Sequence, residues 1–186
     1  MSAVLDNRRL SADEYLRWDA DQPDKHEYIA GEVFAMVGVT RRHNIVALNL
    51  ARQLASKLEG TPCRVFISDI KLEVAAANAY FCPDVMVTCD AADLKADQIM
   101  HAPTLLVEVL SPSTASYDRG EKFSAYRQIE SLREYILIDP DKQRVEGFRR
   151  DPDGRWIVME YPPAASLNFT SLAVEIAWQA VFDGVD

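Results

Sequence analysis

Short runs of hydrophobic residues divide the middle of the chain, and this pattern predicts β-strands. The first two runs read as a hairpin, from His26 to Ala30 and from Val33 to Val37, with Gly31-Glu32 at the turn. The further predicted strands are Arg64–Ile67, Ile70–Val74, Pro83–Thr88, Thr104–Leu110, Tyr135–Ile138, Arg144–Arg149 and Trp156–Glu160. Strands therefore dominate the centre of the chain.

Helical signals lie at the edges of this strand-rich block. Ser11 and Glu14 match a capping box and begin a short helix that runs through about Trp18. Thr40 is a suitable N-cap for a long helix that ends near Glu59, with apolar residues at helical spacing along one face. Both helices precede most of the predicted strands.

The second half of the chain adds one more helix, predicted over Arg119–Ile129. The tail from Leu172 to Phe182 fits a strand or a helix. A large helix on each side of the strand-rich block favours an α/β fold with a mixed central β-sheet flanked by α-helices. No repeat, low-complexity tract or linker divides the sequence, so we expect residues 1–186 to form a single domain.

Composition narrows the class of protein. A hydrophobic fraction of 48% with 26% charged residues is typical of a soluble globular chain. No apolar run approaches the roughly 20 residues that span a bilayer, and the N-terminus lacks the apolar centre of a secretory signal. We therefore expect a cytoplasmic protein without a membrane partner. The cysteines Cys63, Cys82 and Cys89 form no CxxC pair and are expected to be isolated reduced thiols.

The net charge of −9 counts against a nucleic-acid partner, because binding to phosphates depends on Lys and Arg. Acids gathered around a metal would inflate this negative count without excluding such a partner. The candidates for a shared basic face are Arg41, Arg42, Arg119, Lys122, Arg127, Arg133, Arg149 and Arg150.

Two acids stand on predicted buried strands. Asp84 opens the apolar run Val85-Met86-Val87, and Glu108 lies inside the run Leu105–Leu110. A buried carboxylate is costly unless its charge is compensated. If the two strands pair antiparallel, the start of the first lies beside the end of the second, and the acids meet. A shared divalent cation would neutralise them, with the Val109 carbonyl as a third oxygen ligand, and such oxygen ligands suit Mg²⁺ or Mn²⁺.

Each acid also has an ordinary structural interpretation. Asp84 follows Pro83, and Pro-Asp is a common turn former. Glu108 would be an exposed acid, or an acid paired with Arg, if its strand lay at the edge of the sheet.

Lys122 stands in the first turns of the helix predicted over Arg119–Ile129. From there it would reach back over the end of the strand that carries Glu108. In that position it would orient an attacking water and stabilise charge on phosphate oxygens. The alternative is a solvent-exposed pair with Asp118 at i,i+4 spacing. Tyr126, one turn further on, would line the same site or pack in the core.

Two further polar residues are weaker candidates. Glu32 would add a carboxylate from the hairpin, although an exposed turn acid is the simpler interpretation. His43 lies near the start of the long helix beside Arg41-Arg42, where a lone histidine is usually a surface or packing residue.

These residues together give the chain a resemblance to the Uma-two (Uma2) family of restriction-endonuclease-like proteins, within the PD-(D/E)XK nuclease superfamily. The likeness spans about Ser11 to Phe182, and its most specific part is Val107-Glu108-Val109-Leu110-Ser111-Pro112-Ser113-Thr114. The other matching segments are His26–Glu32, the helix with His43, Phe81–Val87, Asp118, Lys122, Tyr126 and Glu134–Pro140.

The resemblance implies a restriction-endonuclease-like domain with a metal-dependent phosphodiester hydrolase site. In that site Asp84 and Glu108 would bind the metal, Glu32 would be a further acid, and Lys122 would be the catalytic lysine. One position departs from the superfamily pattern, in which the lysine usually follows two residues after the second acid. That position is Leu110 here, and in relatives of this type the following helix supplies the lysine, which indicates Lys122.

The resulting hypothesis is a hydrolase: an Mg²⁺- or Mn²⁺-dependent DNA endonuclease that cleaves phosphodiester bonds. Because superfamily relatives often pair to cut two strands, a homodimer is expected. The main alternative is a catalytically inactive nuclease-fold protein that binds nucleic acid or a protein partner. A hydrolase of small phosphoesters is a third possibility.

Overall fold

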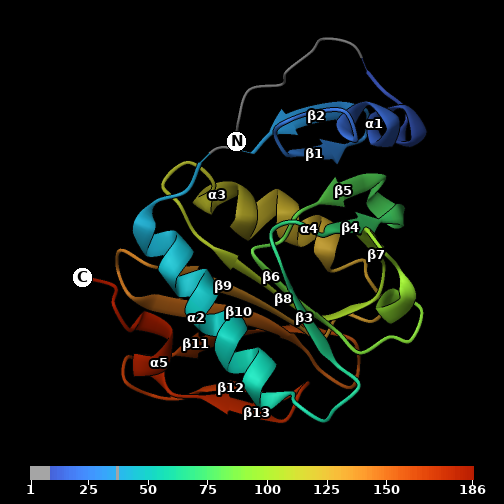
Figure 1. Ribbon diagram of the computed structural model, residues 1–186. Helices are drawn as coiled ribbons and strands as arrows, with labels where there is room; N and C mark the ends of the chain where they lie inside the picture. The colour runs from blue at the N-terminus through green and yellow to red at the C-terminus, as the bar shows by residue number, and fades with distance from the viewer. Residues whose placement is uncertain (1–8, 37) are drawn as a thin grey trace.

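A six-stranded mixed sheet forms the centre of the computed structural model, which describes residues 9–36 and 38–186 (Figure 1). From one edge to the other its strands are β11 (Trp156–Tyr161), β10 (Arg144–Arg150), β9 (Glu134–Asp139), β8 (Pro103–Val109), β6 (Val85–Thr88) and β3 (Arg64–Ile67). Strands β8 and β9 run parallel, and all other neighbours in this sheet are antiparallel.

A second sheet of five strands lies beside the first. Its order is β2 (Glu32–Ala35), β1 (His26–Ile29), β5 (Ala79–Phe81), β4 (Lys71–Val74) and β7 (Ile99–Met100). Helix α1 (Ala12–Asp19) packs against it through a cluster that contains Tyr15, Tyr28 and Tyr80. Two short 3₁₀ turns, η1 (Ala75–Ala77) and η2 (Asp93–Lys95), lie in the connections.

One face of the six-stranded sheet is covered by α2 (Arg41–Lys57), α5 (Trp178–Phe182) and the two-stranded sheet of β12 (Leu167–Phe169) and β13 (Val174–Ile176). Leu50 and Leu54 of α2 pack in this cluster with Val107 of β8. The apolar face that the sequence predicts for the long helix is therefore the one that covers the sheet.

The opposite face is covered by a continuous helical segment. It consists of α3 (Ala115–Tyr117), the π-helical turn η3 (Asp118–Lys122) and α4 (Phe123–Tyr126). Leu106 and Leu110 of the β8 region pack in this second cluster, whereas Leu105, Val107 and Val109 pack in the first. Because strand residues alternate between faces, Glu108 lies on the side of the helical segment.

The predicted mixed sheet flanked by helices is confirmed, with differences at element ends. The helix predicted over Arg119–Ile129 begins earlier, at Ala115, and ends at Tyr126. The ambiguous tail divides into a strand, β13, and a helix, α5, because its first half pairs with β12 while its second half packs on α2. Val37, the predicted end of the hairpin, and residues 1–8 of the N-terminus lie outside the described residues.

The expectation of isolated thiols is wrong for two of the three cysteines. Cys63 and Cys89 form a disulfide, and Cys82 is a buried free thiol. The antiparallel register of β3 and β6 pairs Arg64 with Thr88, which brings the preceding Cys63 next to the following Cys89. Spacing in the sequence does not reveal this proximity, because the register of the two strands creates it.

Within residues 9–36 and 38–186, no helix is both long and apolar enough to cross a membrane.

The close packing of β9 on β10 predicts a strong effect at Gly147. A Cβ atom at this position would lie 2.6 Å from Ile136 Cδ1 and 3.2 Å from the Tyr135 carbonyl oxygen. We expect Gly147→Ala to lower the free energy of unfolding by about 1–3 kcal/mol, as overpacking does in other cores. Gly120, in η3, has open space around the equivalent position, so Gly120→Ala is the matched control and should change stability by less than about 1 kcal/mol. Urea unfolding measures both variants, and equal values would contradict the packing argument.

Candidate active site

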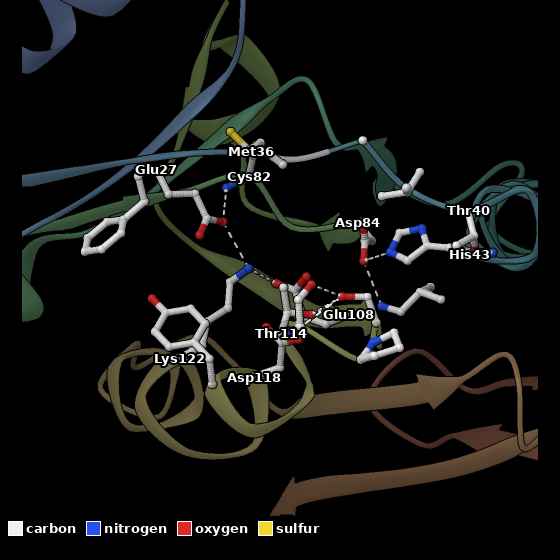
Figure 2. A pocket seen from close by; sticks show the side chains of 18 of the residues that line it. Glu27, Met36, Thr40, His43, Cys82, Asp84, Glu108, Thr114, Asp118 and Lys122 are labelled. Atoms are coloured by element: carbon white, nitrogen blue, oxygen red, sulfur yellow. Dashed lines mark hydrogen bonds and ion pairs between the residues drawn. The ribbon is translucent and has the colours of Figure 1, made fainter. Parts of the chain in front are cut away.

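A pocket of about 250 Å³ lies where the ends of β6 and β8 meet η3 and the hairpin of β1 and β2 (Figure 2). Four carboxylates are among its lining residues: Glu27, Asp84, Glu108 and Asp118. Lys122 is the lysine among them, and His43 lines the same pocket. The recess therefore gathers much more negative than positive charge in a small, largely buried space.

The antiparallel register of β6 and β8 brings Asp84 and Glu108 together. Val85 pairs with Val107, so Asp84, one residue before β6, lies beside Glu108. The Val109 amide donates a hydrogen bond to Asp84 Oδ2 at 2.7 Å. Asp84 is 9% exposed and Glu108 4% exposed, so neither carboxylate is a solvent-facing turn or edge residue.

Lys122 reaches the acids from the π-helical turn η3. Its Nζ lies 2.9 Å from Glu108 Oε1 and 3.0 Å from Glu27 Oε1. The side chain is buried rather than paired in solvent with Asp118. Burial lowers the pKa of Lys122, but Glu108, Glu27 and Asp118 outweigh it and raise that pKa well above its usual range. Lys122 is therefore held as an ammonium ion.

Glu108 is held by two donors at one oxygen. The Tyr126 hydroxyl donates to Oε1 at 2.8 Å, and the Lys122 ammonium contacts the same atom. Burial raises the pKa of the Glu108 carboxyl well above its ordinary value, Lys122 opposes that effect, and Asp84 and Asp118 reinforce it. An additional cation at this carboxylate would relieve the repulsion between the buried acids.

His43 closes the pocket beside Asp84. Its position in the first turn of α2 follows from the N-cap, where Thr40 Oγ1 accepts a hydrogen bond from the His43 amide. The ring Nε2 lies 3.2 Å from Asp84 Oδ2. Among the described residues, Nδ1 of this buried ring has no hydrogen-bond partner. The sequence alone indicated a packing residue, whereas the structure places His43 in the wall of the site.

Glu27 is the site residue that sequence reasoning missed. It lies on β1, and its Oε1 accepts a hydrogen bond from the Cys82 amide in addition to the Lys122 contact. Its signal in the sequence was an acid at the centre of a strand whose neighbours, His26 and Tyr28, are buried. Alternation along the strand turns Glu27 to the other side, where the pocket lies.

The structure does not bring Glu32 into the pocket. In the hairpin register Ile29 pairs with Glu32, so Glu32 stands at the turn end of β2, and its side chain is 42% exposed. Arg9 lies 3.4 Å from its carboxylate. The acid that this hairpin contributes to the pocket is Glu27, because the hairpin turn carries Glu32 away from β6 and β8.

The donor set suits a hard divalent cation in kind, since Asp84, Glu108 and the Val109 carbonyl all offer oxygen. The hydrogen bonds and ion pairs of the two acids, among the described residues, use Asp84 Oδ2 and Glu108 Oε1, which leaves Oδ1 and Oε2 for a cation. Within the described part of the chain, no group of three or more His, Cys, Asp or Glu side chains is already arranged as a metal site. With Asp84 and Glu108, the Val109 carbonyl would be a third oxygen ligand for an ion.

The family follows from a comparison with known proteins. The Uma2 family model, described as "Putative restriction endonuclease", matches residues 12–180. The chain belongs to the Uma2 family. This confirms the resemblance that the sequence motifs indicated.

Two chains from Synechocystis sp. are among the similar proteins. "Uncharacterized protein slr1290" is 36% identical over 177 residues and covers 95% of this chain and 93% of its own. "Uncharacterized protein sll1609" is 36% identical over 162 residues, with 86% of this chain and 92% of its own covered.

A crystal structure of "a putative nuclease belonging to DUF820" from Anabaena variabilis has a similar fold. It aligns with a TM-score of 0.76 and 19% identity over 95% of this chain and 99% of that chain. At this identity the likeness establishes a shared fold.

The buried ion pair between Lys122 and Glu108 predicts a large energetic coupling. Lys122→Met leaves the buried carboxylates without their cation, so we expect the free energy of unfolding to fall by about 3–5 kcal/mol. The double variant Lys122→Met/Glu108→Gln should recover part of that loss, because it removes one of the uncompensated acids. Lys142→Met is the control, since the exposed pair of Lys142 with Asp139 is worth at most about 1 kcal/mol. Additive effects in the chemical-denaturation cycle would show that the pair is not coupled.

Proposed function

We propose that this chain is a metal-dependent DNA endonuclease that hydrolyses phosphodiester bonds in the pocket around Asp84 and Glu108. The observation that carries the proposal is the buried Lys122, held between Glu108 and Glu27 beside Asp84 at the ends of β6 and β8. A buried ammonium among carboxylates is costly to maintain, and phosphoryl chemistry gives it a use.

Asp84, Glu108 and the Val109 carbonyl would hold the ion, for which Mg²⁺ or Mn²⁺ is the best match to oxygen ligands. When bound, such an ion supplies Lewis acidity and an activated water. The backbone positions Asp84, because the Val109 amide, on the strand that bears Glu108, donates a hydrogen bond to Asp84 Oδ2.

Lys122 acts as a fixed positive charge. In this proposal it orients the attacking water and stabilises charge on the phosphate oxygens, as its position beside Glu108 allows. Glu27 and Tyr126 are positioning residues in this proposal: Glu27 holds the ammonium, and Tyr126 holds Glu108 Oε1.

The comparisons support the proposal at the level of family and fold. Membership of a restriction endonuclease family and likeness to a nuclease structure are consistent with a nucleic-acid substrate. Both matches cover most of the chain, which also supports treating residues 1–186 as one restriction-endonuclease-like domain.

Substitutions in the pocket test the proposed activity. We expect Asp84→Asn and Glu108→Gln each to abolish DNA cleavage and to weaken Mn²⁺ binding, because each removes a metal ligand. Lys122→Arg should lower kcat by about 10²–10³-fold while Mn²⁺ still binds, since the charge is retained but displaced from the phosphate. Glu32→Gln is the matched acid control and should cleave as the unmodified chain does, because Glu32 lies outside the pocket.

Plasmid and oligonucleotide cleavage in Mg²⁺ or Mn²⁺ gives the rates, and titration calorimetry gives the metal affinity. Unchanged metal affinity in both acid variants would disprove the assigned ligands. If the unmodified chain cleaves no DNA substrate with either ion, the catalytically inactive nuclease-fold interpretation takes its place.

A further inference from the structure

We propose that the substrate of this site is an unpaired DNA strand, with one nucleotide inserted into the pocket, and not an intact duplex. This inference rests on the proposed nuclease function and defines its substrate class. It follows from the depth of the site, the state of the basic residues and the nature of the pocket walls.

The reacting groups lie too deep for a rigid duplex. Lys122 is 5% exposed and Glu108 4% exposed, at the base of a recess of about 250 Å³. That volume is close to the lower end of the range of pockets that enclose small ligands, about 300–1,000 Å³, so it has room for about one nucleotide and not for a base pair. Enzymes that act on a base within an enclosed site use single strands or extrude the target nucleotide, because paired and stacked bases cannot enter, and the same steric limit applies to a nucleotide at this depth. A flexible strand can bring its phosphate to Lys122 without that cost.

Several basic residues that would bind a duplex are engaged within the protein. Arg42 contacts Asp141, Arg119 contacts Glu146, and Arg149 contacts the buried Glu134. Arg150 donates to the carbonyls of Glu130 and Arg127. These ion pairs and hydrogen bonds occupy four members of the basic face that the sequence suggested.

The net charge of −9 also favours a single strand over a duplex. A duplex carries about one negative charge per 1.7 Å of axis, whereas one strand carries one per 3.4 Å. A single strand therefore meets half the repulsion per unit length.

The pocket walls offer apolar contact in place of charge. Phe34, Met36, Val39 and Tyr117 line the pocket together with the carboxylates. The register of β1 and β2 pairs Phe34 with Glu27, so the ring stands beside the acid that holds Lys122. In the described part of the chain, neither Phe34 nor Tyr117 stacks on another ring. Their ring faces are therefore available to nucleic-acid bases, and proteins that bind single strands stack bases on aromatic side chains.

Val39 extends the apolar wall of the pocket. It is 54% exposed at the mouth of the pocket, in the segment between β2 and α2. Figure 2 shows Met36 and Thr40 of this segment on the side of the recess away from Lys122. A nucleotide between these walls would have its phosphate at Lys122 and its base against apolar side chains.

The direct test compares one labelled oligonucleotide as a single strand, as a blunt duplex and as a duplex with an unpaired arm, in Mg²⁺ and in Mn²⁺. We expect kcat/KM for the single strand to exceed that for the blunt duplex by about tenfold or more, with cuts in the third substrate confined to the unpaired arm. Equal or faster cleavage of the blunt duplex would overturn the inference and leave the nuclease function intact.

Fluorescence anisotropy in Ca²⁺ separates the inference from the catalytic proposal. If no substrate is cleaved, the proposed function fails, and binding of the same oligonucleotides decides the substrate class alone. Tighter binding of the single strand supports the inference, whereas equal or weaker binding than the duplex overturns it.

Variants of the aromatic wall provide the second test. Phe34→Leu and Tyr117→Leu should each raise KM for the single strand by about tenfold with little change in kcat, because a stacking surface is lost while the reacting groups remain. Ile157→Ala removes an exposed apolar side chain on the edge strand β11, away from the pocket, and is the control. An unchanged KM in both leucine variants, with unfolding curves like those of the parent, would overturn the inference.

Discussion

The ammonium of Lys122 between Glu108 and Glu27 is the interaction on which the site depends. The three residues come from three different parts of the fold: Glu108 from β8 of the six-stranded sheet, Glu27 from β1 of the five-stranded sheet, and Lys122 from η3. A charge buried this deeply is tolerated only where its counter-charges are in place. The two sheets and the helical segment must therefore be docked together for the site to exist.

The same interaction bears on how an acidic protein could hold the anionic substrate proposed for it. Most of the carboxylates of the pocket are buried, and the Lys122 ammonium, 2.9 Å from Glu108, partly offsets their charge. Arginines on the surface act mainly as structural ties, as with Arg149 and the buried Glu134. The net charge of the chain is therefore a poor guide to the chemistry inside the recess.

The sequence predicted those features that alternation and local spacing determine. The mixed sheet and the long helix with its apolar face follow from residue patterns along single elements. The proximity of Asp84 and Glu108 was expected on the condition that their two strands pair antiparallel, and they do. Features that depend on pairing between distant elements were not predictable. The Cys63–Cys89 disulfide requires the register of β3 and β6, and the choice of Glu27 over Glu32 requires knowing which end of the hairpin meets β6 and β8. The roles of the site residues remain predictions.

The π-helical turn η3 has a consequence for how the lysine is controlled. A lysine at position 110 would be fixed by the rigid ladder of β8, whereas Leu110 is buried in the second hydrophobic cluster. Lys122 instead stands at the end of a widened turn, a geometry that is rare in proteins. If that turn tightened to ordinary α-helical winding, the ammonium would rotate about the helix axis and leave its carboxylates. The winding of these five residues thus determines where the Lys122 ammonium lies relative to Glu108 and Glu27.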